Sequence, residues 1–165
     1  MVEAREAARR LRTEPPRRGQ APGIALRVRK NESMKTERLL LVDDMPGMRQ
    51  LIGLVATKAG YSVKSAGNAV EFKTIFESFE PSVIVLDLLI PDEDRIELMW
   101  YLHRKDFAGA IVIVSGASKT IHVAAQTMAK GLRLCVADSF GKPFYVQKLH
   151  DSLLRLRGAP TSRAA

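Results

Sequence analysis

The chain has 165 residues, of which 46% are hydrophobic, so one folded domain with a segment to spare is expected. No apolar run approaches the ~20 residues that span a membrane, and the basic N-terminus lacks the apolar core of a secretory signal. The single cysteine, Cys135, excludes an intramolecular disulfide and a cysteine metal site, and we expect a cytoplasmic protein.

The formal net charge of +8 comes largely from the first 33 residues. These hold nine Lys and Arg against four Asp and Glu, whereas residues 34–165 hold 17 against 14. The stretch RTEPPRRGQAPG in this segment is too poor in apolar residues to offset the entropy of folding. We therefore expect residues 1–33 to be a disordered basic leader, or a sequence upstream of the true start at Met34. Nucleic acid is an unlikely partner for the chain and would bind only through this leader.

Beyond the leader, short apolar strands alternate with amphipathic helices. Strands are predicted at residues 38–44, 61–66, 82–87, 109–116 and 132–137. Helices are predicted from Pro46 to the stop at Gly60, and at 69–79, 95–105, 118–131 and 145–157. This alternation predicts an α/β domain over 34–157, with a parallel sheet covered by helices on both faces, and a short tail at 158–165.

Chemically active residues stand where the predicted strands end. The first strand ends in Asp43 and Asp44, the third in Asp87 and the fourth in Ser115, and Lys142 comes after the fifth. Alone, each acid would suit a helix cap or a solvated loop, the serine a turn, and the lysine the protein surface. Together they would meet at one edge of the sheet, where ligands bind in open α/β folds. Clustered carboxylates need a cation, and oxygen ligands suit Mg²⁺. The ammonium of Lys142 and the hydroxyl of Ser115 would suit a phosphoryl group.

The motifs LLLVDD, VIVLDLLIP, IVIVSGAS and GKPF together resemble the receiver domain of two-component response regulators, over about residues 37–156. The resemblance implies a flavodoxin-like doubly wound (βα)5 fold, with a five-stranded parallel sheet of order 2-1-3-4-5. It also implies a cis bond before Pro143. The region AKGLRLCVADSFGKPF is most similar to receivers linked to cyclic-di-GMP phosphodiesterase domains, although a stand-alone receiver is expected here.

By this resemblance Asp87 is the phospho-acceptor, and Asp43 and Asp44 bind Mg²⁺ with Asp87 and the backbone carbonyl of Leu89. Ser115 is then the switch hydroxyl. Lys142 then contacts the phosphoryl group.

The implied function is that of a bacterial phosphorelay module rather than an enzyme. A sensor histidine kinase or a histidine phosphotransfer protein would donate the phosphoryl group. The resulting aspartyl phosphate would switch binding to a downstream protein partner. A nucleotide-binding domain is disfavoured because glycine-rich phosphate loops are missing after the strands.

Two positions depart from the family pattern. Receivers usually carry Tyr or Phe three residues before the Lys, but this chain has Ser139 there, with Phe140 next to it. The loop after the phospho-acceptor commonly ends in Asp-Gly, but here it reads Asp94-Arg95. The first departure leaves open an alternative, a receiver-fold adaptor that acts without phosphorylation.

Overall fold

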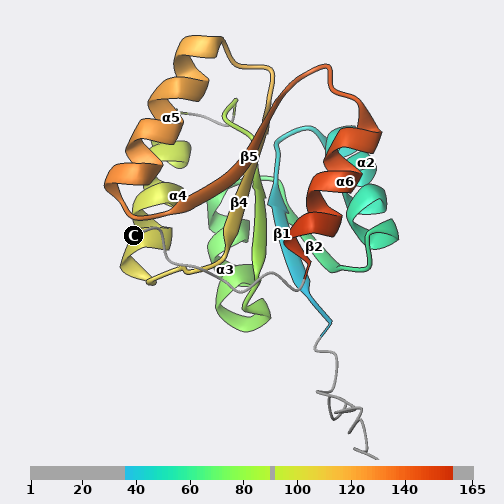
Figure 1. Cartoon of the computed structure of the whole chain (residues 1–165). Helices are drawn as coiled ribbons and strands as arrows, with labels where there is room; N and C mark the ends of the chain where they lie inside the picture. The colour runs from blue at the N-terminus through green and yellow to red at the C-terminus, as the bar shows by residue number, and fades with distance from the viewer. Residues whose placement is uncertain (1–35, 90–91, 158–165) are drawn as a thin grey trace, which may run out of the picture. The chain divides into compact units, whose positions relative to one another are not determined.

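A five-stranded parallel sheet with helices on both faces forms the described part of the chain (Figure 1). The computed structural model describes residues 36–89 and 92–157. The elements are β1 (Arg38–Val42), α2 (Pro46–Lys58), β2 (Ser62–Ala66), α3 (Ala69–Phe79), β3 (Val83–Leu86), α4 (Asp92–Arg104), β4 (Ala110–Ser115), α5 (Lys119–Gly131), β5 (Cys135–Gly141) and α6 (Val146–Leu156). The strand order β2-β1-β3-β4-β5 confirms the predicted doubly wound fold.

The apolar strands are buried because helices cover both faces of the sheet. In β1, Leu39 and Leu41 pack in one core cluster, which includes residues of α2 and α6. Leu40 and Val42 pack in a second cluster, with residues of α3, α4 and α5. Figure 1 shows the same division of the helices between the two faces. Since side chains alternate along a strand, a strand buried on both faces has an unbroken apolar run.

The fifth strand differs from its predicted range. It runs from Cys135 to Gly141 rather than over 132–137. Leu132 and Leu134 belong to the turn after α5, where Arg133 has a φ of 56°. Both leucines are buried in the core, so this turn has the apolar sequence of a buried strand although its backbone is not extended. The true strand lies at the edge of the sheet, is only partly buried, and therefore holds polar residues.

Residue pairing in β5 determines which way its later side chains point. A register irregularity lies beside Ile111 and Val112 of β4. Beyond it, Ser139 pairs with Ile113 of the α3–α4–α5 cluster. The next residue, Phe140, packs against the α2–α6 cluster on the opposite face.

The remaining boundaries agree closely with the prediction, although α4 begins at Asp92, three residues earlier than expected. The predicted leader (1–33) and tail (158–165) lie outside the described residues. In the part of the chain that the structure describes, no helix is both long and apolar enough to cross a membrane.

Candidate functional site

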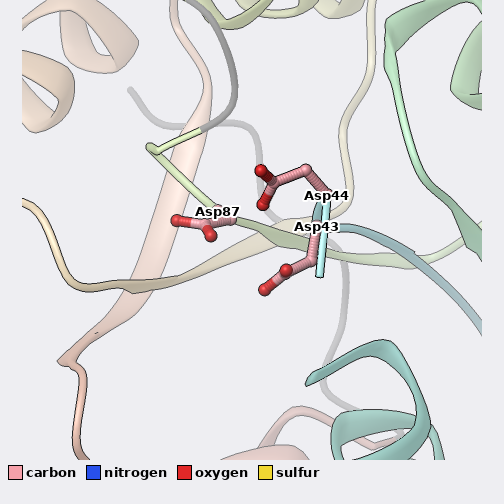
Figure 2. Close-up of side chains that lie close together, drawn as sticks. All are labelled: Asp43, Asp44 and Asp87. Carbon is pink, nitrogen blue, oxygen red and sulfur yellow. The ribbon is translucent and has the colours of Figure 1, made fainter. Parts of the chain in front are cut away.

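Three carboxylates meet at the carboxyl edge of the sheet. Asp43 and Asp44 follow β1, and Asp87 follows β3, the strand that pairs with β1. One carboxylate oxygen from each lies within 4.8 Å of the others, as the grouping in Figure 2 illustrates. Asp43 and Asp87 are buried, with 1% and 2% of their surface exposed, whereas Asp44 is exposed. The structure therefore brings together the three acids that the strand pattern predicted to meet.

The ammonium of Lys142 joins the two buried acids. Its Nζ donates hydrogen bonds to Oδ2 of Asp43 and to Oδ2 of Asp87, each at 2.7 Å. Lys142 follows directly on β5, and its peptide bond to Pro143 is cis, as the resemblance implies. Within residues 36–89 and 96–157, Lys142 is the cation that forms ion pairs with these acids.

Backbone groups hold the other oxygen of each buried acid. The N–H of Met45 donates to Oδ1 of Asp43 at 2.8 Å, and the N–H of Leu89 donates to Oδ1 of Asp87 at 2.9 Å. In both cases the donor lies two residues after the acid, as in an Asx turn. Each carboxylate is thus fixed by its own loop on one side and by Lys142 on the other.

Burial and ion pairing act in opposite directions on this site. Burial raises the pKa of Asp43 above its ordinary value, although the hydrogen bonds from Lys142 and from the Met45 N–H lower it. Burial lowers the pKa of Lys142, but the hydrogen bonds to Asp43 and Asp87 and the negative charges of these two acids together outweigh burial, so that this pKa is raised. Lys142 is therefore an ammonium at neutral pH, and the site favours a further positive charge near Asp43.

The donor set fits a hard divalent cation. Two of the three carboxylates share the ammonium of Lys142, and the oxygens of all three are close enough to ligate one ion. Mg²⁺ binds proteins through a few carboxylate oxygens and keeps several waters or phosphate oxygens as its other ligands. Leu89 lies beside Asp87 through its N–H bond, and a ligand role for its carbonyl stays a prediction.

Ser115 is fully buried at the end of β4. Its Oγ accepts a hydrogen bond from the Ala117 N–H at 3.2 Å, and its carbonyl accepts one from the Lys142 N–H at 2.8 Å. The residue predicted to supply the switch hydroxyl is thus hydrogen-bonded through its backbone to Lys142. Asp94 and Arg95 fall within α4, but their side chains lie outside the described residues.

Two residues at this edge escaped the sequence reasoning. Arg49 of α2 donates from Nη1 to the carbonyls of Asp43 and Asp44, at 2.7 and 3.1 Å, and so ties the loop after β1 to the helix. His122 of α5 places its ring in contact with both Ser139 and the carbonyl of Ser115. The unusual serine at position 139 was the signal that a different partner was needed there.

The family model described as the response regulator receiver domain matches residues 39–154. The chain belongs to this family. The match confirms the resemblance to two-component receivers. This family serves phosphotransfer signalling. A link to phosphodiesterase domains stays a prediction.

Individual relatives agree with this assignment. Sporulation initiation phosphotransferase F of Bacillus subtilis is 28% identical over 120 residues, which cover 73% of this chain and 93% of that protein. The transcriptional regulatory protein GltR of Pseudomonas aeruginosa is 29% identical over 113 residues, which cover 67% of this chain and 45% of that regulator. The chain thus spans less than half the length of that regulator.

A solved structure with the same fold is the response regulator protein TrrA of Thermotoga maritima, in complex with Mg²⁺-BeF. It aligns with a TM-score of 0.60 at 21% identity, over 73% of this chain and 99% of that one. At this identity the likeness supports the fold.

Proposed function

We propose that this receiver accepts a phosphoryl group on Asp87 from a phosphohistidine, in the presence of Mg²⁺, and that the aspartyl phosphate switches binding to a protein partner. The donor would be a sensor histidine kinase or a histidine phosphotransfer protein. The observation that carries the proposal is the bridge of Lys142 between two buried acids, 2.7 Å from each. This bridge aims a permanent positive charge at the carboxylate that would react.

In the proposed reaction, the carboxylate of Asp87 attacks the phosphorus of the phosphohistidine. A phosphorus–oxygen bond forms, the phosphorus–nitrogen bond breaks, and the imidazole keeps the electron pair of the broken bond. The N–H of Leu89 holds Oδ1 of Asp87, which orients the carboxylate for an in-line approach. Lys142 then stabilises charge on the transferred group, since phosphoryl transfer depends mainly on positioning and electrostatics.

Asp43, Asp44 and Asp87 would hold Mg²⁺ together with the Leu89 carbonyl. When bound, the ion supplies charge neutralisation at the phosphoryl oxygens. The Mg²⁺-BeF complex of TrrA supports this part of the proposal. Ser115 would donate its hydroxyl hydrogen to a phosphoryl oxygen and give up its present contact with the Ala117 N–H.

A second candidate is an adaptor that acts without phosphorylation. Ser139 favours it, because a serine cannot reorient as the usual aromatic ring does. The intact acid set and Lys142 favour phosphorylation instead. A cytoplasmic location, expected from the sequence, stays a prediction.

The test is intact mass after incubation of the full chain with acetyl phosphate and Mg²⁺, and separately with a phosphorylated histidine donor. We expect a gain of one phosphoryl group that is lost on chelation and in Asp87→Asn. Asp151→Asn, which neutralises an exposed acid on α6, is the matched control and should gain the group normally. Folded protein that gains no mass from either donor would leave the adaptor as the remaining function.

A further inference from the structure

The aromatic residue nearest to Ser139 cannot serve as a switch ring on the α5 side of the sheet. Phe140 is adjacent in the strand and therefore points to the opposite face. There it packs against the α2–α6 cluster, with its ring centroid 6.5 Å from that of Phe144. Ser139 stays on the face covered by α3, α4 and α5.

His122, in the first turn of α5, contacts Ser139 on that face. Its Nδ1 lies 2.8 Å from Oγ of Ser139, and its Nε2 lies 3.3 Å from the carbonyl oxygen of Ser115. A carbonyl oxygen only accepts hydrogen bonds, so Nε2 must carry a hydrogen. In the neutral ring Nδ1 then accepts from the Ser139 hydroxyl. The partners thus select one tautomer of the imidazole.

The carbonyl that His122 contacts belongs to the proposed switch residue. It accepts hydrogen bonds from two groups, the Lys142 N–H at 2.8 Å and the His122 ring. The Ser115 carbonyl oxygen therefore links Lys142, Ser115 and α5. A displacement of the Ser115 backbone must lengthen or redirect the bond to His122.

We propose that His122 and Ser139 form a relay that transmits the state of Ser115 to α5, in place of an aromatic switch ring. This inference rests on the proposed phosphorylation. In the unphosphorylated state, the ring ties the start of α5 to the end of β4 and to β5. When Ser115 moves toward a phosphoryl group and its backbone is displaced, the ring loses its alignment with the Ser115 carbonyl. The first turn of α5 then shifts relative to β5. Val123, the residue after His122, is 53% exposed, so the shift would change the surface of α5.

A purely structural role for His122 predicts a different behaviour. If the ring only fastened α5 to the sheet, its hydrogen bonds and tautomer would be the same with and without a phosphoryl group. The ring nitrogens therefore distinguish the two roles directly, because their NMR shifts report which nitrogen carries the hydrogen and how strongly it is bonded.

The experiment uses the full chain with labelled histidines, and beryllium fluoride with Mg²⁺ as the phosphoryl analogue. The chain has three histidines, so His103 and His150, outside the relay, are internal controls. We expect the ring nitrogens of His122 to shift on loading, together with backbone amides of the first two turns of α5. The rings of His103 and His150 should change little.

Three variants of the two relay residues, with one control variant, separate the relay from the binding event. Ser139→Ala removes one hydrogen bond of the ring, and His122→Gln keeps a donor for the Ser115 carbonyl. With Ser139→Ala the α5 amide shifts should fall by more than half, while Gly116 and Lys142 amides still respond to loading. His122→Gln should retain more of the α5 response than His122→Phe. Thr127→Val removes an exposed hydroxyl that donates to the Val123 carbonyl within α5 and should respond as the wild type.

The relay is overturned if Gly116 and Lys142 respond to loading while the His122 ring and α5 do not. It is also overturned if α5 responds fully in both Ser139→Ala and His122→Phe. A chain whose Gly116 amide ignores the analogue and which gains no phosphoryl mass would instead refute the proposed function, and the relay with it.

Discussion

Replacing Lys142 with Met would leave two buried carboxylates without the ammonium that they share. Nζ lies 2.7 Å from each acid, and only 13% of the Lys142 side chain is exposed. At this distance the attraction is about 6 kcal/mol per pair at an effective dielectric constant of about 20. Desolvation of the ions offsets much of this, and removing one partner of a buried pair costs about 3–5 kcal/mol. We expect the free energy of unfolding to fall by about that amount at neutral pH without Mg²⁺.

Urea unfolding of the full chain, followed by circular dichroism in the presence of a chelator, measures this loss. Lys105→Met is the matched control, because Lys105 pairs with Glu77 at the surface, where the two side chains are 41% and 55% exposed. Its loss should be about 1 kcal/mol or less. Added Mg²⁺ should stabilise Lys142→Met more than the control, since the ion replaces the missing charge. An equally small loss of unfolding free energy in both variants, or equal stabilisation of both by Mg²⁺, would show that Lys142 does not neutralise the buried acids.

Three further predictions concern the described part of the chain. Because the folded-state pKa of Lys142 is raised above the ordinary 10.5, its contribution is present at neutral pH and lost as pH rises beyond that value, so urea unfolding of Lys142→Met should lack this alkaline loss. The hydroxyl of Tyr61 donates to the Leu153 carbonyl at 2.9 Å, and burial raises its pKa from 10.0 to about 12. Wild-type stability should therefore fall between these pH values as the unfolded state ionises first, and Tyr61→Phe should show a shallower fall in the same unfolding series. Phe72 is fully buried, so Phe72→Ala should cost about 3–5 kcal/mol in urea unfolding but leave Mg²⁺ affinity, measured by calorimetry, unchanged.

The meeting of the acids was predictable because it follows from topology. An alternating strand and helix pattern forces the strands to be parallel, and parallel strands bring their carboxyl ends to one edge. Correct prediction of the two strand ends was therefore enough to place Asp43 and Asp87 together. The two hydrogen bonds from Lys142 to these acids could be anticipated in the same way, because the motif GKPF marks the end of β5.

The relay could not be predicted, because it depends on details smaller than an element. The register irregularity in β5 decides whether Ser139 or Phe140 faces α5, and a shift of one residue would exchange them. His122 then has to face Ser139 from the first turn of a helix whose start the sequence predicts only approximately. The apolar turn at Leu132 and Leu134 also moved the predicted strand three residues toward the N-terminus.

Reductive trapping with borohydride after phosphorylation, followed by peptide mapping, shows directly whether Asp87 is the residue that accepts the phosphoryl group. Borohydride reduces an acyl phosphate to an alcohol, so the phosphorylated aspartate becomes homoserine. We expect homoserine at residue 87 alone, and only when Mg²⁺ is present during phosphorylation. Homoserine at Asp43 or Asp44, or trapping that persists without the metal, would contradict this expectation.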